Sequence, residues 1–182
     1  MKKISLITAL CAATALGTSA FAETVLRLDE VAVGELDPAK ASDYADSILM
    51  FNVYDTLVLP AQGGPGHTPH LDASWNVDGA VYTFKLRDDV MFQSGNTMTS
   101  ADVVYSVQRM QALGAGLSYL FAGVTADAID KNTVQLTLKT PYAPFIASLV
   151  RLPIVDAALV KANSSSEWGE DFLSANGAGT GA

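Results

Sequence analysis

Cysteine is almost absent from this sequence, since Cys11 is the only one among 182 residues. It lies in the apolar N-terminal stretch and follows Leu10, whereas a lipid-modified cysteine has a small residue before it. We therefore expect no lipid anchor. The rest of the chain has no cysteine, so it can form no disulfide and has no thiol chemistry.

Histidine is also scarce, with His67 and His70 as the only two. They fall in a loop rich in glycine and proline, without clustered carboxylates nearby, so a solvated loop is a better interpretation than a metal site. The G-x-S-x-G nucleophile elbow is missing, because Leu120 follows residues 116–119, and no G-x-x-x-x-G-K-S phosphate loop occurs. We predict no enzyme activity, no cofactor and no metal; the alternative is a secreted hydrolase.

The N-terminus has the composition of a secretory signal. Lys2 and Lys3 precede an apolar stretch at residues 4–16, which is too short to span a bilayer comfortably. Ala20-Phe21-Ala22 forms an A-x-A cleavage site. This pattern predicts a signal peptide at residues 1–22 and a mature chain that begins at Glu23, with a retained N-terminal anchor as the alternative.

Basic residues are in the minority, at 11 Lys and Arg against 19 Asp and Glu. Without Lys2 and Lys3 the basic residues number 9, and the formal net charge becomes -10. Such acidity argues against nucleic acid and anionic membrane surfaces as partners. No second hydrophobic stretch reaches transmembrane length.

Residues 71–107 predict a strand, a turn and a capped helix in succession. Tyr82, Phe84 and Leu86 alternate with polar residues, as in a strand with one buried face. Asp78-Gly79 before them is a tight-turn signal. Thr99 stands three residues ahead of Asp102, which is typical of a helix N-terminus, and apolar residues follow at helical spacing, namely Val103, Val107 and Met110.

The other segments alternate between strand and helix patterns without a regular repeat. We expect strands at 24–28 and 133–139, helices at 42–57 and 142–150, and a surface loop at 60–69, while 152–160 is ambiguous. Trp75, Phe84 and Phe92 are expected in the core, and Arg87 is expected to pair locally with the acidic residues after it. The glycine-rich end is expected to be a turn or a frayed tail. The predicted fold class is α/β, here a mixed α+β arrangement, because strands and helices alternate without a regular repeat.

The order of these residues resembles the large periplasmic solute-binding proteins of peptide-, nickel- and opine-type ABC importers. Their hallmark is L-x-x-S-W, an aromatic-rich F-x-L-R strand, V-x-F-x-x-G and T-x-x-D-V-x-x-S. The matching residues are Leu71, Ser74-Trp75, Phe84-Lys85-Leu86-Arg87, Val90, Phe92, Gly95, Thr99, Asp102-Val103 and Ser106. Further matches are Leu36-Asp37-Pro38, the segment 52–57 with Asp55 in place of Glu, Pro141, Ala143-Pro144-Phe145 and Gly179-Thr180-Gly181.

The resemblance covers residues 24–182 and implies the N-terminal part of a two-lobe, type II-like periplasmic-binding-protein fold. Family members are much longer, so the chain resembles the N-terminal third of one. The implied organisation is a signal peptide (1–22), the start of the first lobe (23–54), an accessory subdomain (55–168) and a truncated return to the first lobe (169–182). A monomer in the periplasm is expected.

The resemblance also implies candidate ligand-binding residues. In peptide-binding relatives the loop after the first strand lines the cleft, and its main chain pairs with the peptide in β fashion. The matching positions are Glu30, Val31 and Ala32, with a plain solvent loop as the alternative. Tyr119 lies where relatives carry an aromatic residue near the cleft, but its apolar neighbours leave a core position equally open.

The predicted function is capture of a small solute, a peptide first of all, and its delivery to an ABC permease in the inner membrane. A secreted hydrolase and a structural or chaperone-like periplasmic domain are the competing classes. The solute stays open among dipeptides, longer peptides, nickel chelates, opines and oligosaccharides, because the acidic residue that holds a peptide's amino group in relatives lies outside the matched part.

Overall fold

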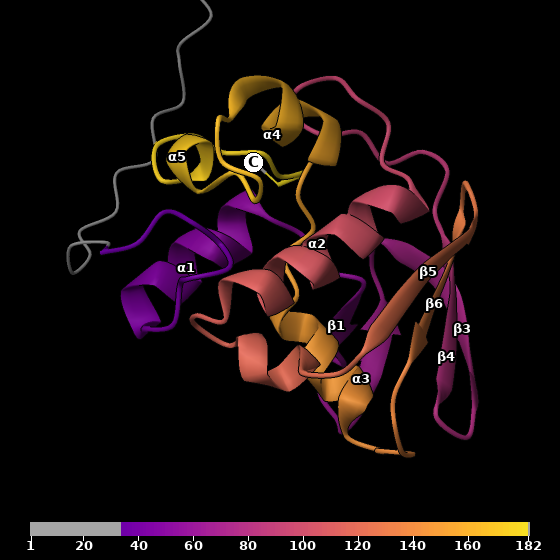
Figure 1. The fold of residues 1–182 in the computed structure, drawn as a ribbon. Helices are drawn as coiled ribbons and strands as arrows, with labels where there is room; N and C mark the ends of the chain where they lie inside the picture. Colours follow the sequence, from indigo (N-terminus) through magenta and orange to yellow (C-terminus); the bar gives the residue numbers. More distant parts are fainter. Residues whose placement is uncertain (1–33, 182) are drawn as a thin grey trace, which may run out of the picture.

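A four-stranded antiparallel sheet forms one side of the molecule (Figure 1). The computed structural model describes residues 34–181, so the signal peptide and the strand predicted at 24–28 lie outside the described residues. The order of the strands is β3-β4-β6-β5, with bounds Asp72–Asp78 (β3), Val81–Leu86 (β4), Thr125–Asp130 (β5) and Thr133–Thr137 (β6). Helices and antiparallel strands occupy separate layers, which confirms the mixed α+β class.

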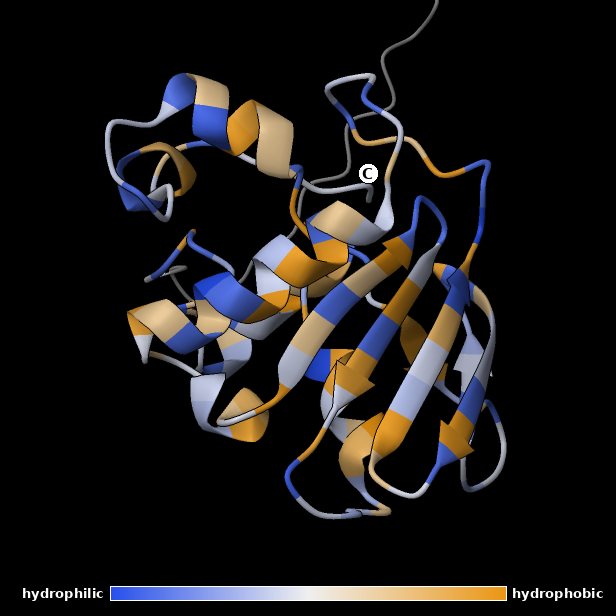
Figure 2. Ribbon diagram, turned by 45° about the vertical axis from the view of Figure 1, so that its right-hand side comes forward, coloured by the Kyte–Doolittle hydropathy of each residue, from blue (hydrophilic) through white to orange (hydrophobic). Residues whose placement is uncertain are grey.

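The two central strands follow the predicted alternation. Tyr82, Phe84 and Leu86 of β4 are buried, and so are Val134 and Leu136 of β6. Figure 2 shows the resulting alternation of hydrophobic and hydrophilic residues along the sheet. Gly79 has a φ of 60° in the turn between β3 and β4, a conformation that glycine adopts without strain.

Helix α2 (Ser100–Leu113) packs on the buried face of the sheet. It begins at the predicted residue, because the Asp102 carboxylate accepts from the Thr99 backbone N–H at 2.8 Å. It ends at Gly114, whose φ of 61° is left-handed. Within residues 34–181, no helix combines the length and the apolar character needed to cross a bilayer.

Strands β3 and β5 form the two edges of the sheet and were not predicted from the sequence. Most of their side chains are exposed, so burial alternates along neither strand, although Ala73, Trp75 and Val77 of β3 do alternate with polar residues in the sequence. Trp75 lies on β3 and is only partly buried against the core, whereas Phe84 and Phe92 are buried as expected. The prediction that Trp75 belongs to the core is therefore confirmed only in part, because it packs on the core from its edge.

The predicted loop at 60–69 contains a short hairpin. Strand β1 (Val58–Pro60) pairs with β2 (His67–Pro69), and the glycine-rich turn lies between them. His67 is part of β2. His70 is only partly solvated, because its Nε2 lies 2.8 Å from Asp55 Oδ1.

The remaining helices are shorter than predicted. Helix α1 (Tyr44–Val53) begins after Asp43, whose side chain accepts from the Asp46 N–H, and ends at Tyr54, which is extended. The helix expected at 142–150 is one turn, α3 (Phe145–Ser148), followed by the 3-10 turn η2 (Leu149–Arg151). The ambiguous segment 152–160 runs extended into α4 (Ala157–Asn163), and α5 (Glu170–Leu173) follows.

Two apolar clusters lie on either side of α2. The larger one joins the sheet to α2, and the second joins α1, α4 and α5 to Tyr105 of α2. Arg109 of α2 lies between them and forms a buried pair with Asp37, at 2.6 Å from Nη1 to Oδ1 and 2.5 Å from Nη2 to Oδ2. The predicted pairing of Arg87 is also present, at 2.9 Å from its Nε to Asp89 Oδ1.

The glycine-rich end is docked, so the expectation of a frayed tail is wrong. Gly181 N–H donates to Val53 O at 3.1 Å, and Gln93 N–H donates to Gly179 O at 3.0 Å. A Cβ on Gly179 would stand 2.0 Å from Val53 O. The glycines therefore serve close approach of two backbones rather than flexibility.

Asp72 is buried at the start of β3, and its Oδ2 has no hydrogen-bond partner among the described residues. Burial raises its pKa from 3.8 to about 6. Between these two values the folded state keeps a proton that the unfolded chain releases, so the free energy of unfolding falls as the pH rises through this window.

We expect Asp72→Asn to remove this loss and to stabilise the protein at pH 7 by about 1–3 kcal/mol. The measurement is urea unfolding at pH 4.5 and pH 7. Asp78→Asn is the control, because Asp78 lies on the same strand and is exposed. An Asp72→Asn protein with the same pH dependence as the wild type would show that Asp72 ionises freely in the folded state.

Candidate functional site

A groove of about 510 Å³ lies along the exposed side of α1, between that helix, the 3-10 turn η1 (Ser118–Phe121) and η2. We call it the α1 groove. Three aromatic residues at its surface are exposed to solvent, Tyr44 by 77%, Phe51 by 51% and Tyr119 by 68%. The other lining residues are Ser42, Asp43, Ser47, Ile48, Leu117, Leu120 and Arg151.

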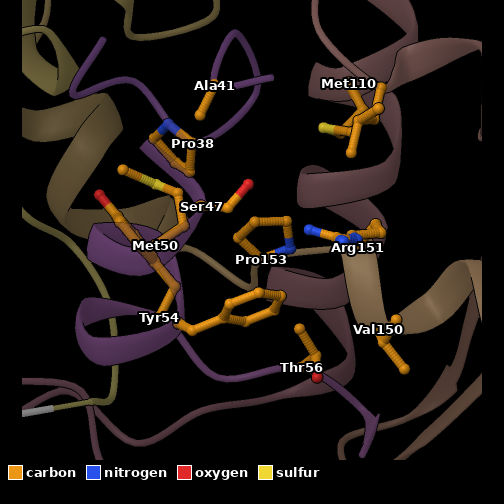
Figure 3. Close-up of a pocket in the computed structure, with 12 residues that line it drawn as sticks. Pro38, Ala41, Ser47, Met50, Tyr54, Thr56, Met110, Val150, Arg151 and Pro153 are labelled. Carbon is orange, nitrogen blue, oxygen red and sulfur yellow. The ribbon is translucent and has the colours of Figure 1, made fainter. Parts of the chain in front are cut away.

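The floor of the groove opens into a small apolar pocket shown in Figure 3. Met50 of α1 and Tyr54, the C-cap of this helix, face Met110 of α2, with Pro153 between them. Burial raises the pKa of Tyr54 to about 12, so its phenol stays neutral at physiological pH. The floor is therefore mainly apolar, and Arg151 is the charged residue that lines it.

A second hollow of about 360 Å³ adjoins the groove on the side of β1. Phe51 and Arg151 line both hollows, so they form the ridge between them. The Arg151 guanidinium carbon stands 5.1 Å from the centre of the Phe51 ring, within the range of a cation–π contact. This contact holds the arginine head group over the concave surface.

Tyr119 is the one predicted site residue that lies among the described residues. The structure places it on η1, exposed at the edge of the α1 groove, so the alternative of a core position is wrong. Glu30, Val31 and Ala32 lie outside the described residues, and their pairing with a ligand stays a prediction.

Asp55, which lines the second hollow, ties the C-terminal segment to the end of α1. Asp55 accepts from Thr180 Oγ1 at 2.7 Å through Oδ2, while its Oδ1 meets His70 Nε2 at 2.8 Å. Both carboxylate oxygens of Asp55 are thus engaged. His70 serves structure here, and within residues 34–181 no group of three or more His, Cys, Asp or Glu side chains is arranged to hold a metal ion.

Sequence reasoning missed the contribution of α1. Tyr44, Ile48 and Phe51 stand at i, i+4 and i+7, so they form an apolar stripe on one helix face. Ala45 and Met50 form the buried face, and a helix that is apolar on both sides was the available signal. Arg151 could not be placed, because it falls between the helix predicted at 142–150 and the ambiguous segment 152–160, and its partner Phe51 lies far away in the sequence.

The arrangement is suited to binding. Concave surfaces of a few hundred Å³ with aromatic walls and a few polar groups are typical of small-molecule sites. The charged groups along the α1 groove are Asp43 and Arg151, and Asp43 is already engaged as the cap of α1.

Comparison with known proteins gives a consistent family. A family model described as bacterial extracellular solute-binding proteins, family 5 Middle, matches residues 66–182. A probable D,D-dipeptide-binding periplasmic protein of Escherichia coli (strain K12) is 32% identical over 155 residues, covering 80% of this chain and 30% of the relative. The di/tripeptide-binding protein 2 of Pseudomonas aeruginosa (strain UCBPP-PA14) is 33% identical over 150 residues, covering 70% and 28%.

Solved structures agree in fold. A periplasmic binding protein from Helicobacter pylori in complex with the peptide STSA superposes with a TM-score of 0.69 at 28% identity, covering 81% of this chain and 33% of that one. The PBP/SBP MoaA from A.tumefacien R10 in complex with mannopinic acid gives a TM-score of 0.70 at 29% identity, covering 82% and 31%. The chain thus spans roughly 30% of the length of the curated relatives it matches.

Proposed function

Since this chain belongs to the bacterial extracellular solute-binding proteins of family 5, we propose that it is part of the periplasmic receptor of an ABC importer, which captures a small solute and delivers it to the membrane permease. A short peptide is the first candidate solute, because the relatives named above include a dipeptide-binding protein, a di/tripeptide-binding protein and a complex with the peptide STSA. A family of solute-binding proteins favours binding over the hydrolase alternative.

The α1 groove carries the proposal on this chain. Its exposed aromatic side chains lie on a concave surface, where soluble proteins rarely leave apolar area without a partner. We assign Tyr119 to the wall that contacts the solute, and the backbone of Glu30, Val31 and Ala32 to the β-type pairing expected from the resemblance.

The domain organisation is part of this proposal. Residues 1–22 serve as the cleaved export signal, 23–54 begin the first lobe, 55–168 form the accessory subdomain and 169–182 return to the first lobe. Two observations support this organisation: the sheet and α2 lie wholly within residues 55–168, and Gly179 and Gly181 dock on the end of α1.

The test is peptide binding by the protein as the cell exports it, purified from the periplasm. Mass spectrometry of this protein is expected to give a chain beginning at Glu23. Pools of di- to pentapeptides are expected to raise its melting temperature, since a ligand at a hundred times its Kd adds about 2.7 kcal/mol. The peptides are then recovered and analysed.

Tyr119→Ala is expected to weaken binding, whereas Tyr142→Ala is the matched control, because Tyr142 is also exposed but lines none of the hollows beside α1. Peptides recovered intact support a receptor. Cleaved peptides would favour the hydrolase, and a pool that leaves the melting temperature unchanged would contradict a peptide receptor.

A further inference from the structure

Arg151 is an exposed cation without an acidic partner. The other two arginines among residues 34–181 form ion pairs, Arg87 with Asp89 and Arg109 with Asp37. Arg151 forms neither a salt bridge nor a hydrogen bond with any described residue, and its contact is with the Phe51 ring. This stands out in a protein with a formal net charge of -8, where carboxylates outnumber cations.

The carboxylates around the groove are already engaged. Asp43 caps α1 by accepting from the Asp46 N–H at 3.0 Å, and Asp46 accepts from Gly34 N–H at 3.0 Å and from Glu35 N–H at 3.1 Å. Asp55, which lines the second hollow, holds His70 and Thr180. Uncompensated positive charge therefore remains on the ridge between the two hollows.

The guanidinium is also held in a defined place. The cation–π contact with Phe51 keeps the head group near the ring while its N–H groups stay available, and Figure 3 shows its nitrogen atoms directed toward Pro153, into the pocket. A planar fork of N–H donors matches the two oxygens of a carboxylate, and an arginine already placed loses less entropy on binding.

We propose that Arg151 is a ligand-binding residue of the α1 groove that takes a carboxylate of the solute, while Phe51, Tyr44 and Tyr119 contact its apolar part. The inference rests on the proposed function, because it takes the groove as the solute site. It narrows the solute to an acid, and for a peptide it assigns the C-terminal carboxylate to Arg151.

The experiment uses the exported protein and three pools of di- and tripeptides: free acids, C-terminal amides, and C-terminal amides that carry one glutamate side chain. Calorimetry is run on the wild type, Arg151→Gln and Arg87→Gln. Arg87 is the matched control, because it is an exposed arginine outside the groove. Because Arg151 is exposed, its variant is expected to fold, and its melting curve checks this.

The wild type is expected to bind the free acids about tenfold or more tighter than the plain amides, the range expected for a charge-assisted hydrogen-bonded pair. Arg151→Gln is expected to lose this preference, and Arg87→Gln to keep it. Preference for the glutamate amides equal to that for the free acids would show that any carboxylate suffices and overturn the assignment to the C-terminus.

An Arg151→Gln protein that binds free acids as tightly as the wild type would overturn the proposal while leaving the receptor function intact. A wild type that binds none of the three pools would overturn peptide capture itself and this inference with it.

Discussion

Replacing Arg109 by leucine is expected to lower the free energy of unfolding by about 3–5 kcal/mol, the usual cost of leaving a buried charge without its partner. Arg109 is 1% exposed and Asp37 is 0% exposed, so neither side chain can turn to water. The guanidinium also donates from Nε to the Trp168 carbonyl at 2.5 Å. The pair therefore joins the loop before α1, the middle of α2 and the turn before α5.

A second substitution distinguishes lost charge balance from lost packing. Asp37→Asn in the Arg109→Leu background removes the stranded carboxylate, and we expect it to restore part of the stability. Guanidinium chloride unfolding followed by circular dichroism measures all four proteins of the cycle. Arg109→Leu within 1 kcal/mol of the wild type would mean that water reaches Asp37 and that the pair is not buried in solution.

This pair also shows where sequence reasoning ends. Asp37 was identified as part of the L-D-P motif, but Arg109 appears in the sequence only as one polar position of an amphipathic helix. The two residues are 72 positions apart, and no local pattern connects them. Buried ion pairs are set by tertiary packing, so they cannot be predicted from spacing.

Helix and strand positions were predicted correctly where the interactions that set them are local in the sequence. The bond between Asp102 and the Thr99 N–H spans three residues, and the alternation along β4 needs only the burial of one face. Edge strands β3 and β5 lack such a buried face, because solvent reaches most of their side chains. Their positions come from pairing with β4 and β6, which is a long-range property.

The candidate site was predicted only in part for the same reason. Tyr119 was singled out by resemblance, and it does lie at the rim of a groove. The groove itself arises because α1, η1 and η2 meet, and these segments are separated by many residues. Gly179 suggested a flexible tail, yet its missing side chain serves close contact with Val53.

Phe84→Ala is expected to cost about 3–5 kcal/mol of unfolding free energy, and Trp75→Ala clearly less, about 1–2 kcal/mol. Phe84 is 0% exposed at the centre of the sheet, where truncation leaves a cavity that neighbouring strands cannot fill. Trp75 faces Phe84 in the register of β3 and β4, but it stands on an edge strand and is partly solvated.

Comparing these two variants tests the effect of burial at neighbouring positions of one sheet. Urea unfolding of both variants under the same conditions measures the two losses of free energy. Thr83→Ala on β4 is the control for a change of strand propensity without core loss, because Thr83 is only partly buried. Equal losses for Phe84→Ala and Trp75→Ala would mean that the indole is covered in solution. Another part of the protein would then pack on the β3 edge, and this edge of the sheet would be an interface rather than a free surface.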